Sequence, residues 1–250
     1  MIIIKTPKEI ELMREGGEIL AKVLREVSLR VKPGVSTQEL DSLAEELIIK
    51  SKGKPSFKGY KGYPAALCAS VNNEVVHGIP SSEKILKSGD IVGLDLGLEY
   101  KGCFTDMTIT VPVGKVSKIA HKLIKVTKNS LTQGIRKIEP GNFISDISRA
   151  IQDYVERQGF SVVRDLVGHG VGREVHEDPP VPNFFDPKLN PIELKERMTL
   201  ALEPMINMGS YEVEVLDDGW TVVTRDGFLS AHFEHTVAVT KEGYEILTII

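Results

Sequence analysis

Four acidic residues interrupt strongly apolar stretches of the sequence. The stretches are GLDLG, FTDMT, ALEPM and HFEHT, and their acidic residues are Asp95, Asp106, Glu203 and Glu234. Exposure or a salt bridge would explain any one of them, but burying four uncompensated charges is very costly, and none of these stretches contains a lysine or an arginine. Bound divalent cations would neutralise the carboxylates, so the pattern predicts a metal site.

Two of the carboxylates belong to one predicted β-hairpin, in the segment GLDLGLEYKGCFTDMTIT at residues 93–110. A two-residue loop at Tyr100 and Lys101 would place Asp95 directly opposite Asp106, on the same face of the hairpin. At about 5 Å, with an effective dielectric constant of about 20, two such carboxylates repel each other by roughly 3–4 kcal/mol. Cations held between them would remove that repulsion.

A histidine-containing loop supplies nitrogen donors. The segment VGHGVGREVHEDPP, at residues 167–180, holds His169 between two glycines and His176 seven residues later. A lone histidine is more often a structural or a surface residue, but the small neighbours of His169 allow the backbone to approach a site closely. Oxygen and nitrogen donors without a thiolate are typical of two hard or borderline divalent ions, about 3.5–4 Å apart and bridged by carboxylates.

The elements that must position these residues occur twice along the chain. Capping boxes predict helices that begin after Thr6 and Ser36, and another helix is predicted near residues 117–138. Two apolar stripes align at an offset of 107 residues: Leu40, Leu43, Ala44, Leu47 and Ile48 with Ile147, Ala150, Ile151, Tyr154 and Val155. An offset of 108 residues aligns Asp95 with Glu203. We interpret the chain as an internal duplication.

The second half ends in strands, two of which the Asp-Gly turn at residues 218–219 joins into a hairpin. Glu203 and Glu234 lie symmetrically about this turn and are predicted to be cross-strand neighbours, provided that no bulge shifts the register. Helices followed by antiparallel hairpins indicate an α+β fold rather than alternating βαβ units. Because no linker separates the halves 1–112 and 113–250, we expect them to share one core as a single domain.

Composition limits the expected partners and location. The formal charge of −4 and the pI near 5.9 argue against DNA or other nucleic acid as the main partner. No apolar run approaches the roughly 20 residues of a membrane span, and the N-terminus lacks the features of a secretory signal. The two cysteines, Cys68 and Cys103, fit a reducing compartment. We therefore expect a cytoplasmic protein, and the basic stretch at residues 50–63 is more typical of a solvated loop than of a binding patch.

In this combination and order, the motifs resemble those of type I methionine aminopeptidases, and the resemblance covers essentially the whole chain. The motifs are the hairpin of Asp95 and Asp106, GHGVG with His169, HEDP with His176, LEPM with Glu203, FEHT with Glu234 and VVHGIP with His77. The resemblance implies the pita-bread fold, with pseudo-twofold duplicated halves and a central curved antiparallel sheet covered by helices. It also implies that Asp106 and Glu234 bridge two divalent ions. Asp95 would bind one ion, and His169 with Glu203 the other.

The implied reaction removes the N-terminal methionine from nascent proteins and peptides, with a preference for a small second residue. The two ions, which could be Mn, Fe, Co or Zn, would activate a water as hydroxide for attack on the first peptide carbonyl. Glu203 would shuttle the proton, His176 would stabilise the oxyanion, and His77 would contact the second residue of the substrate. The resemblance places five residues around the methionine side chain: Tyr60, Tyr63, Cys68, His77 and Trp220. Without it, Cys68 and Trp220 would be interpreted as packing residues.

Two positions depart from the family pattern. Val175 stands where bacterial relatives commonly have an aromatic residue, which predicts a wider or rebuilt pocket wall. His232 stands where glutamine is common, and it is expected either to be structural or to neighbour the metal ligands and alter metal affinity. The resemblance also implies a monomer that contacts the ribosome transiently, with the basic loop at residues 50–61 as a candidate surface.

Two other functions are compatible with a pita-bread fold. Proline-specific aminopeptidases and dipeptidases have the same five ligands, but they generally carry an additional N-terminal domain, and because the first capping box begins at Thr6 we do not expect one here. A catalytically inactive binding protein, such as a ribosome-associated factor, would typically have lost ligands. All five ligand positions are present in this sequence, which favours the peptidase.

Overall fold

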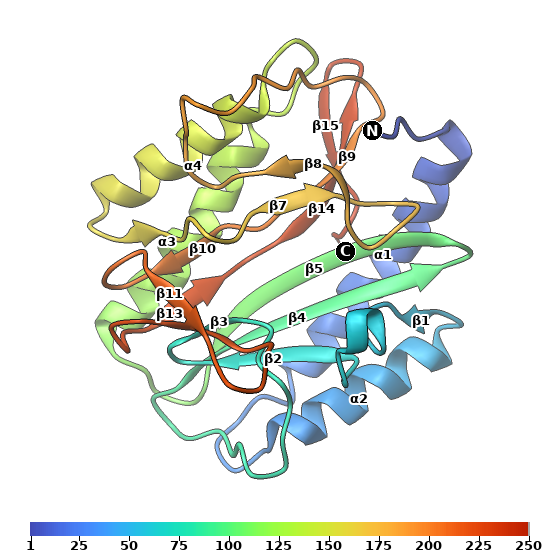
Figure 1. Cartoon of the computed structure of the whole chain (residues 1–250). Coiled ribbons are helices and arrows are strands. Elements are labelled where there is room, and N and C mark those ends of the chain that lie inside the picture. Colours follow the sequence, from blue (N-terminus) through green and yellow to red (C-terminus); the bar gives the residue numbers. More distant parts are fainter. Residues whose placement is uncertain (250) are drawn as a thin grey trace.

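Antiparallel strands form the centre of the molecule, and helices flank them (Figure 1). The structure is a computed structural model that describes residues 1–249. The strands are β1 (Lys54–Pro55), β2 (Leu67–Val71), β3 (Glu74–Val76), β4 (Ile91–Tyr100), β5 (Cys103–Pro112), β6 (Ser161–Val162), β7 (Gly168–Gly170), β8 (Glu177–Val181), β9 (Thr199–Leu202), β10 (Met205–Asn207), β11 (Val213–Val215), β12 (Val222–Thr224), β13 (Ser230–His232), β14 (His235–Thr240) and β15 (Gly243–Ile246).

The strands group into sheets, and the two larger ones include residues from the predicted site. One sheet has the order β1-β4-β2, with β5 also paired to β4, and another has the order β15-β14-β9-β7-β8. Two smaller sheets have the orders β13-β10-β6 and β11-β12-β3. Every strand pairing within residues 1–249 is antiparallel, as the predicted α+β class requires.

Several of the helices begin at side-chain N-caps. They are α1 (Pro7–Ser28), α2 (Thr37–Lys50), η1 (Tyr60–Gly62), α3 (Lys118–Ile135) and α4 (Ile144–Arg157). Thr6 and Ser36 each accept a hydrogen bond from the N3 backbone N–H, and the N3 glutamate accepts one from the N–H of the cap, so both predicted capping boxes are confirmed. In the N-terminal half, α1 packs against β4 and β5, and α2 against β2; in the C-terminal half, α3 packs against α4, β10 and β13 (Figure 1).

Contacts made after the first helix of one half recur in the other half. The N–H of Gly34 donates to the carbonyl oxygen of Leu86, and the N–H of Gly141 donates to that of Leu194. Both glycines adopt a positive φ, of +92° and +90° respectively, which a residue with a Cβ rarely does. The two glycines are offset by 107 residues, like the aligned apolar stripes, and the two leucines by 108, like Asp95 and Glu203.

The β4–β5 hairpin has a different register from the predicted one. Its loop is Lys101–Gly102, one residue later than expected, and both loop residues have the positive φ that a two-residue hairpin turn requires. Asp95 therefore pairs with Thr108, and Asp106 pairs with Gly97, so the prediction that the two aspartates are directly opposite each other is wrong. The displacement is two residues, which preserves the face of the sheet. Both carboxylates still line the same cavity.

The second half has the predicted register. The ladders β9–β14, β10–β13 and β11–β12 all share one register, centred on the turn at residues 218–219. Glu203 and Glu234 lie in the short gap between the first two ladders, in register with each other. The ladders on both sides of these residues thus keep the symmetry about the turn that the sequence suggested.

Buried threonines join β5 to the strands β13 and β14 of the other half. In three successive steps, a threonine hydroxyl or carbonyl on one strand binds the backbone of the other at 2.7–2.9 Å. The pairs of this threonine seam are Asp106 with Thr236, Thr108 with Glu234, and Thr110 with His232. Two predicted metal ligands, Asp106 and Glu234, are thus held by their backbones at the seam.

The larger apolar clusters follow the two helix pairs. One packs α1 and α2 on β2 and β4, and the other packs α3 and α4 on β9, β10, β13 and β14. Within the described part of the chain, no helix is both long enough and apolar enough to cross a membrane. Cys68 and Cys103 are both buried and form no disulfide.

Candidate metal centre and substrate pocket

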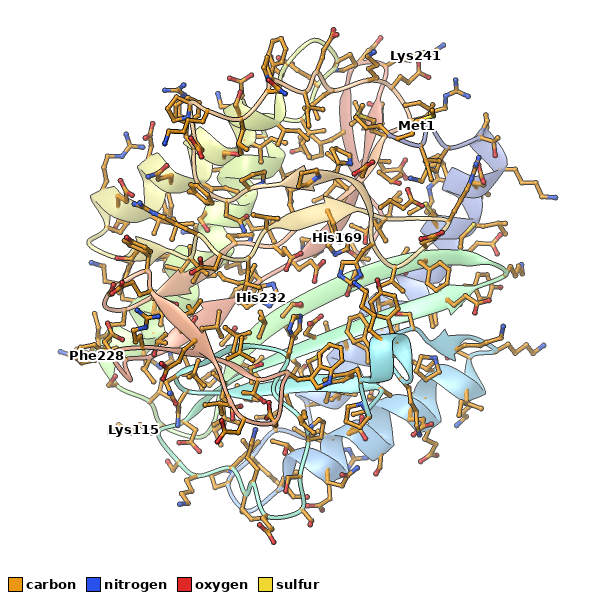
Figure 2. The ribbon with its side chains drawn as sticks, viewed as in Figure 1. Met1, Lys115, His169, Phe228, His232 and Lys241 are labelled. Atoms are coloured by element: carbon orange, nitrogen blue, oxygen red, sulfur yellow. The ribbon has the colours of Figure 1, made fainter. Side chains whose placement is uncertain are left out.

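Every residue predicted for the site lines one cavity of about 170 Å³. Its lining consists of Phe57, Tyr60, Lys61, Tyr63, Cys68, His77, Asp95, Asp106, His169, His176, Glu203, Trp220 and Glu234. They come from β2, β4, β5 and β7, from η1 and from loops between strands, so residues distant in sequence converge here. Figure 2 shows His169 and, near it, His232 in the middle of the face presented to the reader.

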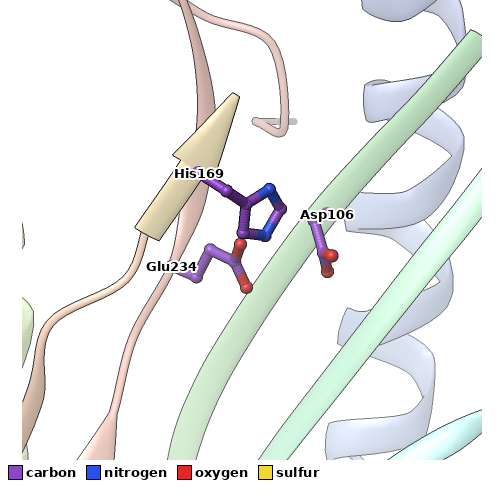
Figure 3. A group of neighbouring side chains, drawn as sticks. All are labelled: Asp106, His169 and Glu234. Atoms are coloured by element: carbon purple, nitrogen blue, oxygen red, sulfur yellow. The ribbon is translucent and has the colours of Figure 1, made fainter. Parts of the chain in front are cut away.

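Three of the predicted ligands converge most closely. Ligand atoms of Asp106, His169 and Glu234 all lie within 4.8 Å of one another, as Figure 3 illustrates. All three residues are buried. Two carboxylates and an imidazole at this separation form a donor set suited to a divalent cation.

Hydrogen bonds orient these donors from behind. The Thr108 hydroxyl donates to Glu234 Oε2 at 2.8 Å, and the Met107 N–H donates to Asp106 Oδ1 at 3.0 Å. His169 Nδ1 lies 2.8 Å from the Gly170 carbonyl oxygen, to which it can only donate. The proton of neutral His169 is then on Nδ1, and Nε2 presents its lone pair as metal-binding histidines do.

Asp95, on β4, and Glu203, after β9, line the same cavity outside that closest group of three. Asp95 Oδ1 and Glu234 Oε1 are buried oxygens without a hydrogen-bond partner in the described part of the chain. The Glu203 carboxylate lies between two imidazoles: Oε1 is 3.5 Å from His169 Nε2, and Oε2 is 3.5 Å from His232 Nε2. Orphaned buried oxygens are costly, and a bound cation would satisfy them.

Electrostatics support the same conclusion. Burial, and then repulsion from neighbouring carboxylates, raises the pKa of Asp106, Glu203 and Glu234 well above the ordinary range. Burial lowers the pKa of His169 and of His232 to about 4, so both imidazoles are neutral at pH 7. The charged form of the carboxylates is destabilised, and the neutral histidines have a lone pair available for a metal. These residues therefore fit divalent cations.

Two further histidines border the open part of the cavity. Burial lowers the pKa of His77 to about 4 and that of His176 to about 3, which keeps both neutral. The His176 ring lies 4.2 Å from that of His169, and its Nδ1 is 3.0 Å from the Tyr60 hydroxyl. His77 adopts φ +58°, a conformation that costs free energy in a non-glycine residue and is common at functional sites.

Apolar groups form the remaining wall. Tyr63, Cys68 and Val175 belong to one buried cluster, and Trp220 packs edge-on against Tyr63 with ring centroids 5.1 Å apart. Burial raises the pKa of the Cys68 thiol, so it contributes a neutral, polarisable contact. The sequence reasoning missed Phe57, an aromatic residue that belongs to the same cluster and lines the cavity.

A glycine in β4 makes room for that aromatic ring. A Cβ built on Gly97 would lie 2.6 Å from a ring carbon of Phe57. Phe57 therefore packs on bare backbone of the strand that carries Asp95. Gly97, the second glycine of GLDLG, is the sequence signal for this close approach.

A buried ion pair, also missed from the sequence, supports the loop that carries His176. Lys5 Nζ contacts Glu177 Oε2, and their side chains are 1% and 2% exposed. Glu177 Oε1 accepts hydrogen bonds from the backbone N–H groups of Arg173 and Glu174, at 2.5 and 3.1 Å. The N-terminal segment thus fixes the backbone immediately before His176.

Comparison with known proteins agrees with this geometry. The model of metallopeptidase family M24 matches residues 11–241. The chain belongs to metallopeptidase family M24. A methionine aminopeptidase of Clostridium perfringens is 55% identical over 250 residues, with 100% of each chain covered.

Solved structures define the fold of this M24 member. A crystal structure of methionine aminopeptidase from Thermotoga maritima is 48% identical and superposes with a TM-score of 0.97, covering 100% of both chains. An Xaa-Pro dipeptidase from Bacillus anthracis is 24% identical, with a TM-score of 0.79 over 99% of this chain and 62% of that one. The second match shares the fold alone. The predicted pita-bread fold is thus confirmed.

Proposed function

We propose that the chain is a methionine aminopeptidase that hydrolyses the bond after an N-terminal methionine, with nascent proteins as its substrates. One observation carries this proposal: a single cavity combines a set of buried oxygen and nitrogen donors with an apolar wall. The full-length similarity to methionine aminopeptidases supports it. A preference for a small second residue is part of the same proposal, and His77 and Trp220, whose ring centroids lie 6.1 Å apart, both line this cavity.

Five residues would hold two divalent ions in this cavity. They are Asp95, Asp106, His169, Glu203 and Glu234, whose oxygen and nitrogen donors all line the cavity. Bound ions of this kind polarise the scissile carbonyl and lower the pKa of a water toward neutrality. Mn, Fe, Co and Zn all suit such donors.

The protein groups around the ions handle the proton and the developing charge. Glu203, whose pKa burial raises, accepts the proton from the attacking water and delivers it to the leaving nitrogen. When the Tyr60 hydroxyl donates to His176 Nδ1, the His176 proton is on Nε2, from which it can stabilise the oxyanion. His77 contacts the peptide on the far side of the bond.

The apolar wall selects the first side chain. Tyr60, Tyr63, Cys68 and Trp220 present aromatic rings and a thiol, which make favourable contacts with a thioether. Phe57 adds a further ring, so the pocket suits an unbranched apolar side chain.

The proposal extends to organisation and location. We propose one catalytic domain of two pseudo-symmetric halves, about 1–112 and 113–250, which the recurring glycine contacts support, acting as a cytoplasmic monomer. Transient ribosome contact through the basic loop at 50–61 is part of the same proposal. In that loop Lys54 pairs with Glu99 and Lys58 with Glu45, which leaves fewer free charges for RNA than the sequence implies.

A substrate panel with and without chelator tests the function. Met-Ala-Ser, Ala-Pro-Ser and Met-Pro peptides would be incubated with wild-type protein in EDTA, and after dialysis into Mn²⁺ or Co²⁺. We expect metal-dependent release of methionine from Met-Ala-Ser only, and a loss of more than roughly 100-fold in Asp106→Asn, since it removes a ligand. Cleavage restricted to proline-containing peptides would indicate a proline peptidase, and no metal-dependent cleavage would indicate an inactive binding protein.

A further inference from the structure

His232 is a buried imidazole at the metal centre to which the mechanism above assigns no task. The residue is 3% exposed, and its Nε2 has no hydrogen-bond partner in the part of the chain that the structure describes. That atom points to Oε2 of Glu203, at 3.5 Å. A buried ring nitrogen without a partner is costly, which calls for an explanation.

Three of the neighbouring donors have a supporting hydrogen bond, and among the residues that the structure describes the Glu203 carboxylate has none. Asp106 accepts from a backbone N–H, Glu234 accepts from Thr108, and His169 donates to a carbonyl. Ligating side chains generally need such a partner to hold their orientation. For the Glu203 carboxylate, the polar side-chain groups that lie against it in the described structure are His169 and His232.

The two oxygens of Glu203 face different imidazoles. Oε1 is on the side of His169, with which Glu203 would hold one ion, and Oε2 is on the side of His232. Oε1 of Glu203 is therefore available to bind an ion, while Oε2 is available to accept a hydrogen bond from His232. The 3.5 Å distance to each nitrogen exceeds an ordinary hydrogen bond, which places the carboxylate midway between the two rings.

The backbone of His232 is fixed, so the ring is presented rigidly. Its N–H donates to the Thr110 hydroxyl at 2.9 Å, and its carbonyl accepts from the same hydroxyl at 2.7 Å. It also pairs with Met205 in the β10–β13 ladder, two residues from Glu203. A donor on such a rigid strand can hold a carboxylate in one orientation.

We propose that His232 is a positioning residue of the metal centre, which donates from Nε2–H to Glu203 Oε2 and holds Oε1 toward His169. This inference rests on the proposed function. It predicts that His232 sets the affinity for metal and the geometry at Glu203, without being a ligand itself.

Metal binding to three variants tests the proposal independently of turnover. Metal-free wild-type protein, His232→Leu and His232→Gln would be titrated with Co²⁺, with the dissociation constant and the visible absorption spectrum as readouts. Leucine removes the donor, whereas the glutamine amide can still donate from a similar position. We expect a 10–100-fold weaker affinity and an altered spectrum in His232→Leu, and near wild-type values in His232→Gln.

His235→Leu is the control for replacing a histidine by leucine, because His235 is a half-buried histidine that lines a separate cavity with α1 residues. It should bind Co²⁺ as the wild type does. Thermal melts would show that each variant is folded, and a misfolded leucine variant would be replaced by His232→Met.

The outcomes separate this inference from the proposed function. Unchanged affinity and spectrum in a folded His232→Leu would overturn the role of His232. Equal damage in His232→Gln and His232→Leu would overturn a hydrogen-bonding role in favour of direct ligation by the imidazole. Failure of the wild type itself to bind Co²⁺ would instead reject the proposed metal-dependent function.

Discussion

Replacement of Glu234 by glutamine should stabilise the metal-free protein while weakening its stabilisation by metal. Glu234 and Asp106 are 2% and 4% exposed, and an oxygen of each lies within 4.8 Å of the other. Two full charges at that separation repel by about 3 kcal/mol at an effective dielectric constant of about 20. Protonating Glu234 at pH 7.5 instead, from its ordinary pKa of 4.5, costs about 4 kcal/mol. Keeping both carboxylates charged is therefore the less costly alternative, and their repulsion destabilises the metal-free fold by roughly 3 kcal/mol.

The effect has a defined pH dependence. Burial and the neighbouring carboxylates raise the pKa of Asp106 and of Glu234 above the ordinary values of 3.8 and 4.5. A raised carboxyl pKa stabilises the fold fully below the unfolded value, and that contribution is lost as the pH rises through the folded value. Metal-free wild-type protein should thus lose stability from about pH 4 upward. Glu234→Gln should lose less, so the difference between them should grow with pH.

Thermal unfolding in EDTA and in Mn²⁺ measures this prediction. The amide oxygen can still accept from the Thr108 hydroxyl, so the side chain keeps its place. In EDTA at pH 7.5 we expect an unfolding free energy about 1–3 kcal/mol higher than that of the wild type, or a Tm roughly 2–12 °C higher. In saturating Mn²⁺ the order should reverse, because only the wild type binds strongly enough to gain about 3 kcal/mol.

Glu46→Gln, on the exposed face of α2, is the control for exchanging a carboxylate for an amide and should shift neither melt. A metal-free Glu234→Gln protein that is less stable than the wild type at pH 7.5 would refute the reasoning. It would mean that the cluster is not under electrostatic strain, and the argument for bound cations would lose its physical basis.

Two further predictions concern the walls of the site. Val175→Phe should raise the KM for Met-Ala-Ser about 10-fold by overpacking the cluster to which Val175 and Phe57 both belong. Phe57→Ala in the same chain should recover most of the loss, and no recovery would show that the two side chains do not compete for the same space. Lys5→Met should lower the Tm by roughly 6–12 °C, because it leaves Glu177 buried without its cation, and it should lower kcat by displacing the loop before His176. An unchanged melt and kcat in Lys5→Met would contradict a supporting role for this ion pair.

Features governed by local rules could be predicted from the sequence. The capping boxes at Thr6 and Ser36 depend on residues three positions apart, and the structure contains both. The register of the second half followed from the Asp-Gly turn at residues 218–219, because one strongly specified turn fixes every pair on either side. The acidic residues were recognisable because charge in an apolar strand has few stable explanations.

Features that depend on tertiary contacts could not be predicted in the same way. The β4–β5 loop could form at Tyr100 or one residue later, and only the positive φ of both Lys101 and Gly102 selects the observed register. Phe57 and the Lys5–Glu177 pair are invisible locally, because their partners lie far along the chain. Gly97 indicated that some group approaches the strand closely, but the sequence did not identify that group as the Phe57 ring.

The threonine seam explains how a cluster of like charges can be built before any cation binds. Between β5 and the β13–β14 segment, Thr108, Thr110 and Thr236 bind backbone groups of the facing strand and are at most 3% exposed. These bonds fix the Cα positions of Asp106 and Glu234 without using their carboxylate oxygens as the main link. The carboxylates are then free to accept cations in a frame that already exists. Repulsion within the metal-free cluster can therefore displace protons or side-chain rotamers, but separating the strands would also break the seam, and so the site should be preorganised for metal.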